Sequence, residues 1–317
     1  MKPFKKSKLF CFSEDLTPEE IEVGLKKLPL HPTTPAIKHT HGFVNADHYL
    51  TAQGNFLVKL YGMHLAVMCF EKRTPSNIAV AILADKKKRE FLKTGEKVTQ
   101  KIERKLRKEA SEELAQKADP QQSFVNIAFD FKDKKVVIDT TANKEIEKIL
   151  DMLSKIGVNL KAENLHFDIH GLLEQIVDEP EKVLSSEFEV GTSLQMRDDS
   201  KKKATVAYKN QDIINQEVST NREKHKSPTA VGLQYKSSIE FTLHNVHTIT
   251  GVRAFNADNS YFTQLLEKIR IEEFGDEIRT DFFQKVGVML VTVQDIYRDF
   301  LAMTNSSDEI KQYMVQE

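Results

Sequence analysis

The chain has 317 residues, and its 46 Lys and Arg residues against 47 Asp and Glu residues leave a formal net charge of −1. Hydrophobic residues make up 40% of it, which is enough to build a sizeable core in one large domain or in two to three small ones. No run approaches 18 apolar residues, so the sequence excludes a membrane-spanning helix.

The N-terminal segment and the cysteines indicate a cytoplasmic protein. The basic start of the chain is followed by an apolar run over 9–12 only, which is too short for a signal peptide. Cys11 and Cys69 both lie in strand-like runs. So few thiols in a chain of this length are typical of a reducing compartment, with both buried as small hydrophobes.

The first part of the chain predicts strands and one capped helix. Thr17, Pro18 and Glu20 form a capping box with proline at the first helical position, so a helix begins there. Tyr61-Gly62 separates two strand-like runs and predicts a hairpin. The expected strands are 4–12, 55–59 and 63–70, and the histidine-containing region 39–48 is expected to be a loop.

Residues 75–121 predict a helical arm. Pro75-Ser76 opens its first helix, whose inward face is expected to hold Ile78, Ala81 and Ile82. A break at Thr94-Gly95 separates it from a second helix over 96–117. Apolar residues recur at every fourth position of that helix, so only a narrow side can pack, on the preceding helix. These residues are Val98, Ile102, Leu106, Ala110 and Leu114.

Strand groups and helices fill the rest of the chain. A hairpin is expected over 124–131 and 136–139, followed by a helix over 143–156. If 55–70 and 123–139 share one sheet, the arm is an insertion. Later elements are expected as helices at 171–177, 260–271 and 294–303, a hairpin of 231–235 and 239–243, and a buried strand at 286–293. This pattern of strand groups with segregated helices indicates the α+β class.

The arm is strongly basic. Residues 86–108 carry eleven Lys and Arg residues and three Glu residues, a net charge of +8. Five of these cations share one helical face: Lys97, Lys101, Arg104, Lys105 and Lys108. Stacked like charges repel, and a polyanion would convert that repulsion into binding by releasing counterions. A solubilising face remains the alternative on charge alone.

A second basic group lies between 201 and 226. It comprises Lys201, Lys202, Lys203, Lys209, Asn210, Gln211, Arg222, Lys224, His225 and Lys226. Lysine and arginine contact phosphates, and Asn or Gln also reach base edges. A flexible charged loop is the equally open alternative.

Catalytic and metal-binding patterns are weak. His39, His41 and His48 have no cysteine nearby, and the pair His166 and His170 lies in a strand-like or irregular context. Residues 103–105 match a Glu-x-Lys nuclease signature, but on a solvent-facing helix with no strand aspartate just before it. Residues 94–99 lack the glycine pattern of a phosphate loop. We therefore expect no catalytic residue, no metal and no cofactor.

Several short strings, collinear over nearly the whole chain, carry a family resemblance. They include His41-Gly42-Phe43-Val44, Glu71–Ser76 just before the arm, Val136–Asp139, Glu163-Asn164 and Lys209–Asp212. Together with the order of elements, they resemble the RdgC family of recombination-associated proteins. No single string is as specific as a zinc motif, so the resemblance rests on collinearity and suggests a distant member.

The resemblance implies a horseshoe-shaped protomer with central and base sheet regions and an inserted helical tip. Two such protomers would form a closed dimeric ring around duplex DNA. The implied parts are a central domain of 1–74 with 122–165, a tip of 75–121, a base of 166–305 and a tail of 306–317. The protein would bind DNA without sequence preference and restrain RecA-dependent recombination in the nucleoid. The expected DNA-binding residues are Lys86, Lys87, Lys88, Lys97, Lys101, Arg104, Lys105, Lys108, Lys201, Lys202, Lys203, Lys209, Asn210, Gln211 and Lys226.

The dimer gate is where the chain departs from the family pattern. The family's gate uses a phenylalanine just after the second tip helix, and that position here falls on Asp119 or Pro120, with Phe124 the nearest aromatic. The expected gate residues are these three. Residues 257–272 resemble an insertion.

The leading hypothesis is a non-enzymatic DNA-binding homodimer that modulates recombination. Duplex DNA is the expected ligand, with single-stranded DNA an open second one, and no membrane partner is expected. A metal-dependent DNA nuclease and a protein-interaction module with a basic arm are the alternatives.

Overall fold

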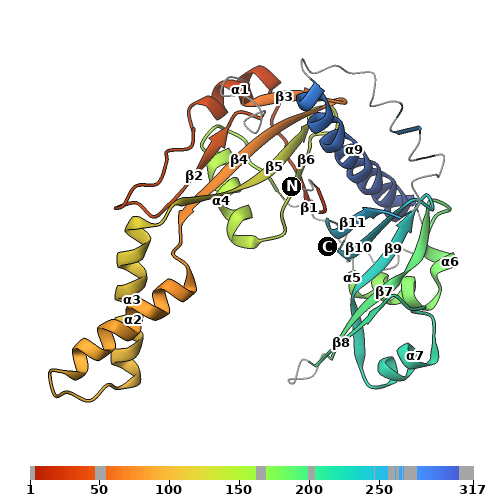
Figure 1. The fold of residues 1–317 in the computed structure, drawn as a ribbon. Coiled ribbons are helices and arrows are strands. Elements are labelled where there is room, and N and C mark those ends of the chain that lie inside the picture. The colour runs from red at the N-terminus through yellow and green to blue at the C-terminus, as the bar shows by residue number, and fades with distance from the viewer. Residues whose placement is uncertain are drawn as a thin grey trace.

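A computed structural model describes residues 4–46, 55–161, 169–198, 204–245, 247–255 and 277–306, with single positions between 261 and 267. One antiparallel sheet runs through both halves of the chain (Figure 1), in the order β2-β4-β5-β6-β1-β11-β10-β9-β7-β8, with β3 paired to β4. The expected mixture of helices and sheet is therefore confirmed. Because β1 lies between β6 and β11, the first strand joins the two halves.

The strands of the first half are β1 Lys6–Cys11, β2 His39–Val44, β3 Leu57–Leu60, β4 Met63–Arg73, β5 Pro120–Asp130 and β6 Lys135–Ile138. Those of the second half are β7 Phe188–Asp198, β8 Thr205–Lys209, β9 Lys226–Tyr235, β10 Ile239–Asn245 and β11 Thr248–Ala254. The helices are α1 Pro18–Lys26, α2 Asn77–Leu92, α3 Gln100–Lys117, α4 Asn143–Ser154, α5 Ile169–Asp178, α6 Pro180–Val183, α7 Gln216–Glu223 and α9 Glu277–Ser306.

Two hydrophobic layers lie on opposite faces of the first half of the sheet. Consecutive side chains of a strand point to opposite faces, so Leu9 joins the layer under α9 whereas Phe10 joins the layer under α1 and α4. The layer under α9 continues through α5 into the second half of the sheet. The arrangement holds both halves in one body.

The local signals of the first half are confirmed. The Thr17 backbone N–H donates to the Glu20 carboxylate at 2.8 Å and the Glu20 N–H donates to the Thr17 hydroxyl at 3.2 Å, which closes the capping box. Tyr61 and Gly62 form the turn between β3 and β4, both at positive φ. The hairpin of β9 and β10 also lies where it was expected.

Two expectations were wrong. Residues 286–293 are not a strand: together with the expected helix at 294–303 they belong to the single helix α9, which buries Val286, Leu290 and Val293 against the sheet. A short apolar run rich in β-branched residues has no periodicity that separates a buried strand from a buried helix. The region of His39 and His41 is strand β2, not a loop, because it pairs with β4 along six residues.

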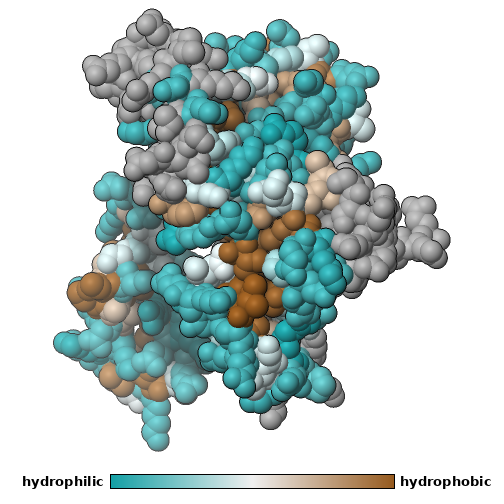
Figure 2. All heavy atoms as spheres, turned by 90° about the vertical axis from the view of Figure 1, so that its right-hand side faces the viewer, coloured by the Kyte–Doolittle hydropathy of each residue, from teal (hydrophilic) through white to brown (hydrophobic). Residues whose placement is uncertain are grey.

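The surface on the side of α9, β9 and α6 is largely hydrophilic, with an apolar area near the centre of the view in Figure 2. Most of the expected helix at 260–271, most of the 257–272 insertion and nearly all of the tail lie outside the described residues. The division into central, tip, base and tail parts stays a prediction.

Candidate nucleic-acid interface

The hairpin of α2 and α3 is inserted between two neighbouring strands. Arg73, the last residue of β4, lies opposite Pro120, the first residue of β5, and both helices project from this end of the sheet (Figure 1). The Arg73 guanidinium donates to the Ala118 carbonyl at 2.7 Å and to the Thr33 hydroxyl at 3.2 Å. These bonds fix the direction in which the hairpin leaves the sheet.

A buried carboxylate lies beside this root. Glu71 is 4% exposed and accepts hydrogen bonds from the Thr33 N–H at 2.6 Å, the Thr33 hydroxyl at 2.7 Å and the Gln122 amide at 2.8 Å. Burial alone would raise its pKa, but these donors and the Arg73 charge outweigh it and lower the pKa. Glu71 therefore stays ionised and holds the root in place.

The hairpin itself has a small core. The expected packing of α3 on α2 is confirmed, but only Val80, Ala110 and Ala115 are buried among its helical residues. The inward orientation expected for Ile78, Ala81 and Ile82 is wrong: all three are exposed, with 74% of Ile78 and 68% of Ile82 accessible. Within the part of the chain that the structure describes, no third element covers that side of α2.

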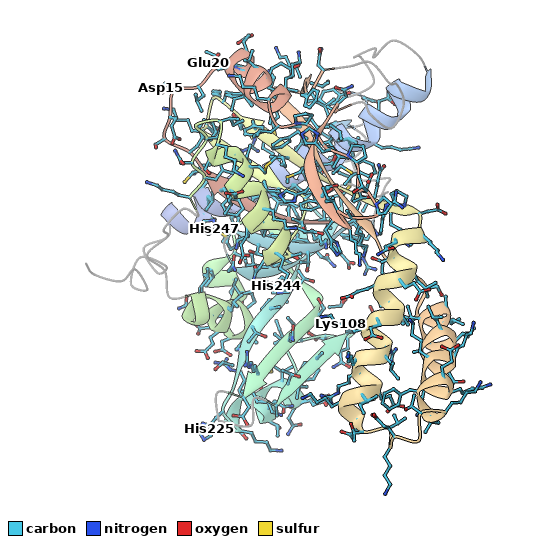
Figure 3. The ribbon with its side chains drawn as sticks, turned by 90° about the vertical axis from the view of Figure 1, so that its left-hand side faces the viewer. Asp15, Glu20, Lys108, His225, His244 and His247 are labelled. Carbon is cyan, nitrogen blue, oxygen red and sulfur yellow. The ribbon has the colours of Figure 1, made fainter. Side chains whose placement is uncertain are left out.

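Ion pairs tie several of the basic residues to acidic neighbours. Lys88 reaches Glu103 at 2.6 Å and Lys87 reaches Glu113 at 3.0 Å, and both bonds cross from α2 to α3. The hydrogen bonds raise the pKa of each lysine. Within α3, Lys105 lies 3.9 Å from Glu109 and Lys108 lies 3.8 Å from Glu112. Lys108 extends from the side of α3 turned away from α2 (Figure 3).

The remaining cations of the hairpin have no ion-pair partner among the residues that the structure describes. They are Lys86, Lys93, Lys97, Lys101, Arg104, Arg107 and Lys117, all exposed. Most of them lie around the turn that joins α2 to α3. The positive charge available to a ligand is therefore concentrated at the distal end of the hairpin.

The net charge counted over residues 86–108 overstates the charge of the whole hairpin. Across 77–117 there are 12 Lys and Arg residues and 7 Asp and Glu residues, a net charge of +5. Glu109, Glu112 and Glu113 follow directly after the counted segment. Glu109 and Glu112 lie four residues after Lys105 and Lys108, a spacing that was a readable signal of pairing.

The structure describes part of the second basic group. Lys209 ends β8, and Asn210 follows in the left-handed conformation at φ 56°, which asparagine tolerates better than most residues. The Gln211 N–H donates to the Thr192 carbonyl at 3.3 Å, so the turn is tied to β7. All three residues are exposed. Lys201, Lys202 and Lys203 lie outside the described residues.

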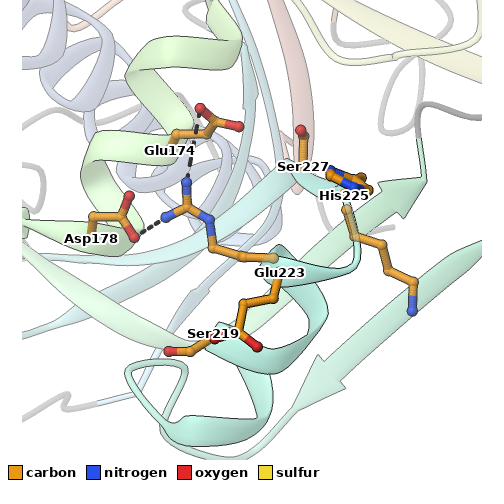
Figure 4. Close-up of a pocket in the computed structure, with 8 residues that line it drawn as sticks. Glu174, Asp178, Ser219, Glu223, His225 and Ser227 are labelled. Carbon is orange, nitrogen blue, oxygen red and sulfur yellow. Dashed lines mark hydrogen bonds and ion pairs between the residues drawn. The ribbon is translucent and has the colours of Figure 1, made fainter.

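Lys226 and its neighbours line a shallow pocket of about 500 Å³ (Figure 4). Arg222 bridges Glu174, at 3.9 Å, and Asp178, so its charge is already neutralised. The Lys226 ammonium donates to the Asn221 side chain at 2.5 Å. With Glu223 also in the lining, carboxylates outnumber Lys and Arg side chains here, which makes this pocket a poor site for a polyanion.

The expected gate residues lie at the root of the hairpin, not at its distal end. Asp119 and Pro120 are exposed at the start of β5. Phe124 packs against a small cluster of the same chain that includes Val67 and Cys69. Whether these residues make a dimer contact stays a prediction.

The described residues show no arrangement of a metal centre. They hold no group of three or more His, Cys, Asp or Glu side chains that could bind a metal ion. His41 stacks on Phe70 at 6.0 Å, and burial lowers its pKa. Glu103 of the Glu-x-Lys string is bound to Lys88. No helix in the described part is long and apolar enough to cross a membrane.

Comparison with known proteins identifies the family of this sequence. The family model described as "Putative exonuclease, RdgC" matches residues 3–286. A protein of Pseudoalteromonas atlantica named "Recombination-associated protein RdgC" is 27% identical over 250 residues, which cover 76% of this chain and 79% of that protein. Since the family match spans most of the sequence, the chain belongs to the RdgC family.

Proposed function

We propose that the protein binds duplex DNA without sequence preference, as a dimer that encircles it, and modulates RecA-dependent recombination. The observation that carries this proposal is the unpaired cationic end of the α2–α3 hairpin, in a chain of the RdgC family. The name of the curated relative supports the role in recombination. In Figure 1 the hairpin and the end of the second half of the sheet that bears β8 and α7 extend from the sheet towards the same side, which supports a horseshoe-shaped protomer.

The distal cations are expected to dominate the electrostatic part of binding. Each phosphate contact steepens the fall of log affinity with log salt by about 0.9. The triple variant Lys97→Gln/Lys101→Gln/Arg104→Gln should therefore reduce the slope by about 2–3. Fluorescence anisotropy of a labelled duplex, titrated at several salt concentrations, measures it.

A charge-matched control separates a local role of the hairpin from net charge. Three exposed lysines lie outside the hairpin, at the C-cap of α1, on β3 and in the β5–β6 turn: Lys27, Lys59 and Lys132. Their triple Gln variant loses the same three charges and should keep the slope of the unmodified protein. Equal slopes for both triple variants would show that the hairpin has no special part in binding.

The exposed side of α2 is the surface we propose for the tip contact of the dimer. Ile78, Ile82, Asp85, Arg89 and Leu92 form one stripe at helical spacing, and Leu92 is 51% exposed. Asp85 and Arg89 pair at 2.7 Å in the middle of it. Two copies of the stripe related by a two-fold axis would place apolar ends on apolar ends and let Asp85 and Arg89 exchange partners. The stripe would thus replace the family's gate aromatic.

Crosslinking tests the contact. An Ile82→Cys variant should form a covalent dimer with a short bis-maleimide at micromolar concentration. Val23→Cys, which replaces a residue 55% exposed on α1, should not. A protein that is monomeric by solution mass with and without DNA would contradict the dimer altogether.

Nuclease activity is the second candidate, because the family description names an exonuclease. Incubation of linear duplex and single-stranded DNA with Mg²⁺ or Mn²⁺ decides between the two functions. Fragmentation that a chelator abolishes would favour the nuclease. Intact DNA under conditions where the protein binds it would favour binding without cleavage.

A further inference from the structure

One face of the second half of the sheet has its side chains turned away from the hydrophobic core. In β9, Val231, Leu233 and Tyr235 belong to the core under α9, so the residues between them face the other side. In β10 the same alternation turns Glu240 and Thr242 outward, and both are only half-buried. Polar side chains therefore line this face.

Two β-bulges hollow the face. Three residues of β7, Gly191–Ser193, lie opposite the single residue Gly232 of β9. Two residues of β11, Gly251 and Val252, lie opposite one residue of β10. Bulges bend a strand and re-aim its side chains, and they recur beside functional sites.

The glycines at these bulges keep the hollow open. A Cβ atom on Gly232 would lie 2.2 Å from the Ser193 hydroxyl, and one on Gly191 would lie 3.0 Å from the Gly232 backbone. Gly251 has φ 69°, a conformation that favours glycine. The result is a pocket of about 480 Å³, far larger than the roughly 30 Å³ that a water molecule occupies.

The lining of this pocket is cationic and rich in hydrogen-bond donors. Lys5, Lys209 and Arg253 enter it against a single carboxylate, Glu240, which pairs with Arg253 at 2.6 Å. The two lysines have no ion-pair partner in the described part of the chain and are exposed. The lining also holds hydroxyl groups of Thr192, Ser193 and Thr242 and the amide of Asn210, beside the apolar side chains of Leu233, Phe241 and Val252. Cationic side chains thus outnumber carboxylates in this pocket, whereas carboxylates outnumber them in the pocket beside Arg222.

We propose that this glycine-floored pocket seats backbone phosphates of bound DNA, with Lys5 and Lys209 as the paired cations and the bulge hydroxyls as neutral donors. The inference rests on the proposed DNA binding and extends the contact already expected at Lys209 to Lys5 and to a pocket in the sheet. Phosphate oxygens accept hydrogen bonds from ammonium and hydroxyl groups alike, and such contacts position a duplex without reading its sequence. Glu240 holds Arg253 at the rim and leaves the two lysines to the ligand.

Two sets of variants test the pocket. Lys5→Gln/Lys209→Gln should lower the salt slope of duplex binding by about 2 and weaken binding more than about tenfold at 50 mM salt. Thr242→Glu places a carboxylate inside the pocket and should weaken binding about tenfold, as expected for one lost phosphate contact. Thr242→Gln introduces a side chain of the same size as Thr242→Glu without the charge, so it should lose only the hydroxyl contact and bind clearly more tightly than Thr242→Glu.

Matched controls and a measurement on the unmodified protein complete the test. Lys27→Gln/Lys59→Gln removes two charges elsewhere and should leave the slope unchanged. Duplex DNA should protect Lys5 and Lys209, but not Lys27, from chemical acetylation read by mass spectrometry. This second measurement remains decisive if a pocket variant fails to fold.

Each outcome decides something. If the unmodified protein binds DNA while the pocket variants bind equally well and Lys5 and Lys209 stay reactive, the pocket is not a phosphate site although the proposed function stands. If the unmodified protein binds no duplex at low salt, the proposed function fails, and the pocket proposal fails with it.

Discussion

The α2–α3 hairpin and the sheet from which it projects place their charged groups in opposite environments. All 19 charged side chains of residues 77–117 are exposed or half-exposed, and their ion pairs join neighbours on the surface. In the sheet, Glu71, Asp130 and Asp139 are buried, and each is held by hydrogen bonds. Exposed ion pairs exchange partners at little cost in free energy. A buried charged group that loses its partner is strongly destabilising. The hairpin is thus suited to an anionic ligand and the sheet to fixing the hairpin's direction.

The largest expected difference between the two regions is in apolar burial. Phe129 in β5 is fully buried, so Phe129→Ala should cost about 3–5 kcal/mol of unfolding free energy. Phe91 at the end of α2 is only partly buried, so Phe91→Ala should cost about 1 kcal/mol. Urea unfolding followed by circular dichroism measures both. Equal costs would mean that the hairpin has more core than its exposure indicates.

Asp139 provides the second test, through pH. Burial raises its pKa to about 6, while the Asn126 amide donates to its carboxylate at 2.8 Å. Because the folded protein holds this proton more tightly, the associated stability is fully present below about pH 4 and is lost as pH rises through 6. Asp139→Asn removes that loss, so relative to the unmodified protein it should gain up to about 3 kcal/mol by pH 7.

On the hairpin, the pH dependence of stability due to Glu113 should have the opposite sign. A hydrogen bond from Lys87 lowers the pKa of Glu113, so its contribution is present at neutral pH and is lost on acidification. The loss of stability that Asp139 causes between pH 4 and 7 should therefore persist in the Glu113→Gln variant. A pH profile of Asp139→Asn parallel to that of the unmodified protein would show that Asp139 is ionised throughout.

The smallest expected effect concerns the joint between α9 and the β3–β4 turn. A Cβ atom on Gly287 would lie 2.1 Å from the Tyr61 ring, but Tyr61 is half-buried and can move outward. Gly287→Ala should cost about 1–2 kcal/mol. In a Tyr61→Ala background the same substitution should cost almost nothing, and this double-mutant cycle isolates the contact. Additive costs would place the strain elsewhere.

Local signals in the sequence predicted local structure well. Thr17 with Glu20 and Tyr61 with Gly62 act through neighbours in the chain, and the structure places a capped helix and a turn at these positions. The orientation of Ile78 and the state of 286–293 depend on partners far along the chain. An apolar residue at helical spacing indicates a packed face only when another element is there to cover it.

Of the candidate site, too, the sequence predicted only the parts that are continuous along the chain. The basic arm and the turn at Lys209 were found from composition and resemblance, whereas the pocket at Lys5 was not. Lys5 and Lys209 are far apart in sequence, and the glycines that make the hollow are ordinary in their own strands. Only the pairing of β1 with β11 brings Lys5 to that face.

That pairing also constrains how the chain can fold during synthesis. β1 can pair with β6 once about half of the chain has left the ribosome. The other edge of β1 stays unpaired until β11, in the last third of the chain, has been made. Until then Lys6 and Lys8 lie on an unpaired edge, and lysines on an edge discourage pairing with other nascent chains. The strand that joins the two halves thus carries its own protection against aggregation during the interval before they meet.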